Sequence, residues 1–138
     1  MRDYQRTKVY NWEFTWLDKP SKSSMTKEAA TEFINRVCSD YGCCVPNIEI
    51  PTRGSSARGG VDRVVFPFTW ALSPVVILHE LSHHMTDLKY GRNRHGPYFV
   101  GVFIDLLNRY LNWDTATLIE SAKLEKIDTR PLYKGRLV

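Results

Sequence analysis

The chain has 138 residues, of which 43% are apolar, and a formal net charge of +4. Such a chain can bury a core without a disulfide or a structural metal, and it has no internal repeats. We therefore expect a single domain over residues 1–138, with a tail from about residue 127. The polar N-terminus and short aliphatic runs argue against a signal peptide or a membrane span, which predicts a cytoplasmic protein. The small positive charge is explained by a solvated surface.

Residues 9–16 alternate between bulky apolar and polar side chains, which is the pattern of a half-buried strand. An aromatic row of this kind packs in a core more often than it binds a peptide or a base. We therefore predict a strand with Tyr10, Trp12, Phe14 and Trp16 on its inner side and Asn11, Glu13 and Thr15 on its outer side.

Residues 26–41 carry apolar side chains at helical spacing and are followed by Gly42, which predicts a helix. Three cysteines lie at its end or just beyond it, Cys38, Cys43 and Cys44. Their odd number and the lack of a Cys-x-x-Cys pair disfavour a disulfide framework. As zinc ligands they would need partners that they lack, so we expect free thiols, which suit a reducing cytosol.

Two further strands are predicted, at residues 48–50 and 61–68. The segment 53–60 between them is rich in glycine and serine. No Gly-Lys-Ser/Thr sequence follows it, so a hairpin connection is favoured over a phosphate-binding loop.

The most informative motif is His-Glu-Leu-Ser-His at residues 79–83. It follows Ser-Pro at residues 73–74, a typical N-cap and first helical residue, and the apolar residues around it recur at mostly helical spacing. Residues four apart share one face of a helix, so His79 and His83 can bind one zinc ion. Glu80 can take a proton from a water on that ion, whose pKa falls to about 7. These residue types predict metal-assisted hydrolysis.

His95 is the expected third ligand. The first helix should end near Gly91, and a second should begin just after His95 and run over residues 97–112. Antiparallel helices joined by a short turn would bring His95 back toward His83. Asp87 is the alternative, because it lies four residues beyond His83 on the same face and carboxylates also bind zinc.

Two further predictions concern the residue next to this motif and the last part of the chain. His84 points about 100° away from His83 and is interpreted as a surface or helix-packing residue. A last helix is predicted from Asp114 or Thr115 to about Lys126, and the chain after it is basic.

The motif and its continuation resemble a known kind of metalloenzyme. His-Glu-Leu-Ser-His-His, followed by His-Gly-Pro-Tyr-Phe from residue 95, is similar to the SprT-like and related short zincins. A narrower resemblance covers nearly the whole chain and is to a family of small metallohydrolases found in actinobacteria and their phages. It rests on Arg-Asp-Tyr-Gln-Arg-Thr-Lys-Val-Tyr at residues 2–10, the helical segment after it, the zinc motif, His-Gly-Pro and the closing helix.

This resemblance implies a compact zincin-like α+β domain. A small sheet and two or three further helices would pack against the helix that carries the motif. The resemblance also implies one Zn²⁺ per chain, with His79, His83 and His95 as ligands and Glu80 as the catalytic carboxylate. Tyr98 stands where relatives frequently have glutamate, which leaves a catalytic part for this side chain open.

In zincins the strand before the zinc helix lies at a sheet edge beside the metal, where an extended peptide pairs with it. Residues 61–66 hold that place here. The resemblance therefore implies that this strand binds substrate and that the loop 53–60 acts as a lid, with a purely structural strand as the alternative. The candidate substrate-binding residues are Val61, Arg63, Val64, Val65 and Tyr98.

The leading hypothesis is a zinc-dependent metallopeptidase of a bacterial cell or a phage-infected host. It would cut a peptide or protein substrate with a zinc-bound water activated by Glu80. A hydrolase of a non-peptide amide would keep the same centre. The alternative of another class is a non-catalytic, metal-holding interaction module, DNA-associated or part of a phage particle. The chain is too short for the separate DNA-binding domain that SprT-like proteins usually carry.

Overall fold

The computed structural model describes residues 3–17, 25–49, 58–60, 62–66, 72–92 and 94–130. These ranges hold five helices and a small sheet, a mostly helical α+β arrangement that confirms the predicted class. None of the described helices is both long and apolar enough to cross a membrane. In chain order the elements are α1 (Arg6–Trp16), α2 (Lys27–Tyr41), β1 (Asn47–Glu49), β2 (Arg58–Gly59), β3 (Arg63–Val65), α3 (Pro74–Tyr90), α4 (Pro97–Leu111) and α5 (Thr115–Leu124).

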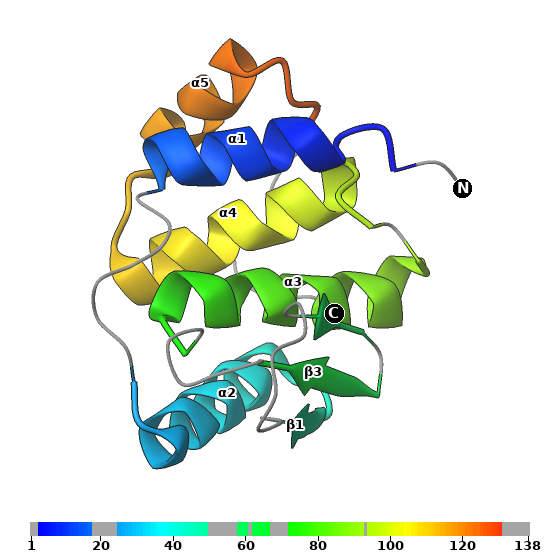
Figure 1. Cartoon of the computed structure of the whole chain (residues 1–138), viewed down its shortest axis with the longest axis vertical. Helices are drawn as coiled ribbons and strands as arrows, with labels where there is room; N and C mark the ends of the chain where they lie inside the picture. The colour runs from blue at the N-terminus through cyan, green and yellow to red at the C-terminus, as the bar shows by residue number, and fades with distance from the viewer. Residues whose placement is uncertain are drawn as a thin grey trace.

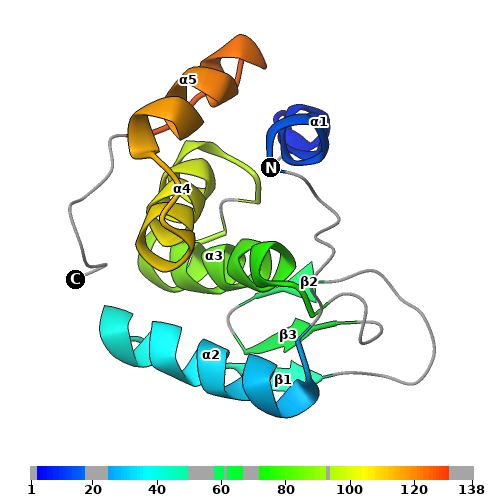
Figure 2. The same cartoon turned by 90° about the vertical axis from the view of Figure 1, so that its left-hand side faces the viewer.

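Helix α3 runs through the middle of the fold. Helices α1, α4 and α5 lie on one side of it, and α2 and the sheet lie on the other (Figure 1, Figure 2). The helix begins as its sequence predicts, because the Ser73 hydroxyl accepts a hydrogen bond from the Val76 N–H at 3.3 Å and a proline follows the cap. It ends at Gly91, as predicted. Most of its side chains are buried, so α3 packs against the elements on both of its sides.

Helices α4 and α5 also begin and end where their sequences predict. Gly96 precedes the first residue of α4, and Asn112 ends this helix in the left-handed conformation at φ 58°. Asp114 caps α5 by accepting a hydrogen bond from the Thr117 N–H at 2.9 Å. Helix α4 packs along α3 and carries the most strongly apolar sequence of the five helices.

Helix α2 is capped by Thr26 and ended by Gly42, which confirms the prediction. It packs on α3 from the side opposite α1. The Tyr110 hydroxyl on α4 donates a hydrogen bond to a carboxylate oxygen of Asp40 on α2 at 2.6 Å. Helix α2 therefore contacts both α3 and α4.

The predicted strand at residues 9–16 is wrong, because this segment is part of helix α1. The buried side chains of α1 are Val9, Trp12 and Glu13, at the i, i+3 and i+4 spacing of a helix. The Trp12 indole N–H donates a hydrogen bond to Ser121 on α5 at 2.8 Å, whereas Phe14 is 73% exposed. The alternating aromatic residues therefore do not share one buried face.

The three strands have the order β1-β3-β2. Strand β3 pairs with β1 in parallel and with β2 antiparallel, so its main chain is hydrogen-bonded on both sides. The expectation that this strand lies at the sheet edge is therefore wrong, since β2 takes that place. Strand β2 itself forms within the segment predicted as a loop, while residues 53–57 of that segment lie outside the described residues.

The beginning of the predicted tail packs against the N-terminal segment. The Gln5 side chain donates a hydrogen bond to the Asp128 carbonyl at 3.2 Å and accepts one from the Asp128 N–H at 2.6 Å. The Arg130 N–H donates to the Pro97 carbonyl at 3.2 Å. Residues 127–130 thus hold the start of α1 beside the start of α4.

Candidate metal centre

The three predicted histidine ligands come together in the structure. His79 and His83 lie one turn apart on α3, and His95 lies in the turn that leads into α4. One ring nitrogen from each histidine lies within 4.8 Å of the other two. Three imidazoles at this separation are a donor set that suits zinc.

The local backbone explains how His95 reaches α3. Arg94, just before it, has a φ of 56°, a left-handed conformation that reverses the chain direction within the short turn. The Gln5 side chain then donates a hydrogen bond to the His95 carbonyl at 2.9 Å. Both features hold this histidine over the middle of α3.

A carboxylate orients the ring of His95. Its Nδ1–H donates a hydrogen bond to Oδ2 of Asp3 at 2.8 Å, which leaves Nε2 without its hydrogen. This Nε2 is buried and has no hydrogen-bond partner among the described residues. Because a buried nitrogen without a partner costs free energy, a bound ion at Nε2 would satisfy it. The residues present therefore fit a metal.

A second carboxylate reaches the cluster from α1. Glu13 is fully buried, and Oε1 of its side chain pairs with Nδ1 of His79, which is only 2% exposed. Carboxylates in this position commonly hold metal-binding histidines in the required orientation and raise the basicity of the ligand. Asp3 and Glu13 thus serve two of the three histidines from one N-terminal segment.

Burial sets the charge state of His95. Desolvation lowers the pKa of its imidazole, and this effect outweighs the raising effect of the hydrogen bond with Asp3. His95 is therefore neutral near pH 7, which is the state that binds a metal.

Aromatic side chains surround the histidines. The Phe99 ring on α4 stacks on His83 with a centroid distance of 4.3 Å and also contacts the rings of His79 and His95. Tyr10, on the exposed side of α1, lies with its ring 5.1 Å from that of His95. These rings restrict the imidazoles to a few orientations and exclude water from their flanks.

Neither Glu80 nor Asp87 belongs to the cluster of three histidines found among the described residues. Glu80 follows His79 on α3 and is only 4% exposed. Asp87, the alternative third ligand, is half-buried and does not join the histidine cluster found among the described residues. The geometry therefore favours His95 over Asp87.

Two of the three predicted substrate-binding valines do not lie at the surface. Val64 and Val65 are buried side chains of β3, the central strand. They are core residues, and at these positions the main-chain pairing that was expected to bind a substrate is already made with β1 and β2. Val61 lies outside the described residues.

The other two candidate substrate residues have partners elsewhere. Arg63 is exposed and forms an ion pair with Glu49 on the neighbouring strand at 3.3 Å. The Tyr98 ring stacks on Tyr90 with a centroid distance of 4.2 Å, and the guanidinium of Arg130 lies over its ring. Tyr98 therefore joins the end of α3 to the start of α4.

Asp3 and Glu13 were not recognised from the sequence. Interpreting residues 9–16 as a strand placed Glu13 on the solvent side. The helical spacing of Gln5, Val9 and Trp12, all of which are buried, is the signal that could have placed Glu13 inward.

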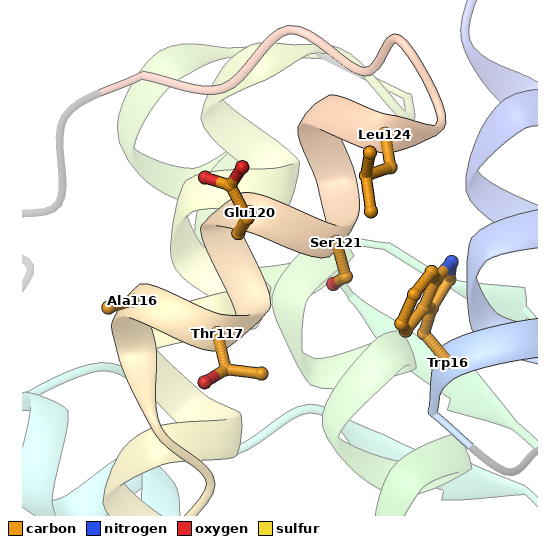
Figure 3. A pocket seen from close by; sticks show the side chains of 6 residues that line it. All are labelled: Trp16, Ala116, Thr117, Glu120, Ser121 and Leu124. Carbon is orange, nitrogen blue, oxygen red and sulfur yellow. The ribbon is translucent and has the colours of Figure 1, made fainter.

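A separate hollow of about 390 Å³ lies between the end of α1 and α5 (Figure 3). It is open to solvent, and none of its lining residues belongs to the histidine cluster. Glu120 supplies its one carboxylate, and it has no histidine or cysteine, so its chemistry does not suggest catalysis. The lining residues are Trp16, Ala116, Thr117, Glu120, Ser121 and Leu124.

Comparisons of this chain with models of protein families, with curated proteins and with solved structures returned no match. The residues of the chain itself therefore carry the functional argument.

Proposed function

We propose that the protein is a zinc-dependent metallohydrolase with a zincin-like arrangement, and specifically a metallopeptidase. The observation that carries this proposal is the cluster of His79, His83 and His95, of which His79 and His95 are buried and His83 is partly exposed, and in which Nε2 of His95 lacks a partner among the described residues. Glu80 lies on the same helix as two of these histidines.

Two of the three histidines have a ring nitrogen that is already paired, which defines the nitrogen left for the metal. His95 would bind the metal through Nε2, because its Nδ1 is held by Asp3. His79 would likewise use Nε2, because its Nδ1 pairs with Glu13. A zinc ion bound there would act as a Lewis acid that polarises a carbonyl group and acidifies water.

Glu80 is the residue proposed to move the proton. Its carboxylate would accept a proton from the attacking water and return it to the leaving amine. A buried carboxylate suits this work, because bulk water does not compete for the proton. Glu80 follows a ligand directly in sequence, so the helix fixes its position relative to the centre.

The substrate proposed is an extended peptide, which zincin-like sites bind by strand pairing. Strand β3 has both sides paired along Arg63–Val65, so a peptide would have to add to an outer strand of the sheet.

The test combines metal analysis with turnover of a peptide library by the zinc-loaded protein. We expect about one zinc per chain at this centre, and Glu80→Gln should lower turnover by about 100-fold or more while the zinc stays bound. Glu120→Gln, an exposed glutamate on α5, is the matched control and should keep full activity.

Equal turnover in the Glu80→Gln variant would exclude the role of general base. If the parent protein binds zinc but hydrolyses only non-peptide amides, the enzyme would be a hydrolase of that substrate class and not a metallopeptidase. Zinc bound without turnover of either pool would favour the non-catalytic, metal-holding module.

A further inference from the structure

A second group of side chains that could hold a metal ion lies on the other side of α3. One donor atom from each of Cys38, Cys43 and His84 lies within 4.8 Å of the other two. The sequence predicts a surface or helix-packing residue at His84, and because His84 is fully buried the surface alternative is wrong. His84 also supplies the partner that the cysteines seemed to lack in the sequence.

The end of α2 places the two cysteines together. Cys38 lies in the last turn of this helix, and Gly42 ends it at φ 68°, a conformation that glycine adopts without strain. The Cys43 N–H then donates a hydrogen bond to the Cys38 carbonyl at 3.0 Å, as in a Schellman motif. This termination turns Cys43 back toward Cys38.

Two backbone carbonyls orient the ring of His84. Its Nδ1 lies 2.8 Å from the Gly60 carbonyl oxygen, and its Nε2 lies 2.7 Å from that of Cys44. An ion would replace the hydrogen on one ring nitrogen, so that proton would be released to solvent and the carbonyl facing this nitrogen would lose its hydrogen bond. The other nitrogen would keep its carbonyl, which is the support that metal-binding histidines usually have.

We propose that Cys38, Cys43 and His84 form a second zinc site, independent of the histidine cluster. Two thiolates and one imidazole are soft ligands that select zinc over hard cations. Four residues separate the two cysteines, which is within the usual spacing of paired cysteine ligands in zinc sites.

The site has a structural task that its position explains. It joins the end of α2, the chain after β2 and the middle of α3, three segments that meet beside the sheet. Cys43 is partly exposed, which gives an ion a route of entry.

The experiment uses the full chain prepared with reductant and titrated with Zn²⁺, with Co²⁺ as the spectroscopic probe. His95→Ala removes a ligand of the first centre only, so this variant should still bind one zinc. Its Co²⁺ form should show thiolate-to-metal absorption. Adding Cys43→Ser to this variant should remove both the remaining zinc and the absorption, while Cys44→Ser, the neighbouring exposed thiol, should remove neither.

A second variant guards against a folding defect. Cys38→Ala replaces a buried thiol by a small apolar side chain, and it should abolish the absorption while the circular dichroism spectrum stays unchanged. The proposal is overturned if the His95→Ala protein binds no ion, or if Cys44→Ser removes the absorption and Cys43→Ser does not. A Cys38–Cys43 disulfide in the reductant-treated protein also overturns it. None of these outcomes depends on hydrolase activity, so the second site can fail or hold separately from the proposed function.

Discussion

Asp3 and His95 lie 92 residues apart in the sequence, yet Oδ2 of Asp3 is 2.8 Å from Nδ1 of His95. The Asp3 carboxylate also accepts a hydrogen bond from the His95 backbone N–H at 3.4 Å. One side chain near the N-terminus thus positions both the ring and the backbone of the third histidine. The remaining ring nitrogen is the buried Nε2 that would bind the metal.

Asp3→Ala should weaken zinc binding by about 10–100-fold, because the ring of His95 would lose the partner that orients it. Asp3→Asn should weaken it less, since the amide oxygen can still accept the hydrogen of Nδ1. Competition with a chromophoric chelator measures both affinities. Asp62→Ala, an exposed aspartate beside β3, is the control and should bind zinc like the parent protein. Parent-like affinity in the Asp3→Ala variant would contradict the orienting role.

The same argument applies to Glu13, which pairs with His79 from inside the fold. Glu13→Leu should reduce zinc affinity by about 10–100-fold, and Glu13→Gln by less, because only the second variant keeps an acceptor for Nδ1 of His79. Isothermal titration with Zn²⁺ checks the ranking. Phe14→Leu changes the exposed neighbour on α1 and should leave affinity unchanged. If the leucine variant bound zinc more tightly than the glutamine variant, the carboxylate would not act through His79.

The choice of third ligand can be tested directly. His95→Ala should reduce zinc affinity at the histidine centre by at least about 100-fold, because a directly bound ligand contributes more than its supporting residues. Asp87→Ala should reduce it much less, since Asp87 lies outside the cluster of donor atoms. The measurement is zinc per chain after dialysis against a weak chelator, in a Cys43→Ser background that removes the second proposed site. The opposite ranking would make Asp87 the ligand.

Local signals explain which parts of the fold could be predicted. Thr26, Ser73 and Asp114 each accept a hydrogen bond from a backbone N–H in the first turn of the helix that follows. Gly42 and Gly91 follow the last residues of α2 and α3. These signals act within a few residues, so the sequence alone contains them. The spacing of His79 and His83 on one helix is local in the same sense.

The parts that could not be predicted depend on distant partners. Glu13 is a buried charged residue, which is rare unless it is paired, and its partner is on another helix. The central place of β3 depends on its parallel pairing with β1, which is distant in sequence, and on β2 pairing along its other side. His84 is a further case, because its role follows from contacts with Gly60 and Cys44. Periodicity along one segment reports none of these contacts.

The pKa of His95 predicts how the metal-free protein responds to acid. Burial lowers this pKa in the folded state below the ordinary value of about 6.5, so near that pH the unfolded chain binds more protons than the folded one. His95 therefore contributes stability that is present above the unfolded pKa and is lost as the pH falls through the folded pKa. The free energy of unfolding of chelator-treated protein, measured in urea, should fall more steeply from pH 7.5 toward pH 5 in the parent than in His95→Gln. His84 has the opposite shift, because its hydrogen bonds, chiefly with Cys43, outweigh the lowering effect of burial, but both proteins share it and it cancels in the difference. Parallel pH profiles of the two proteins would show that His95 is not held neutral by burial.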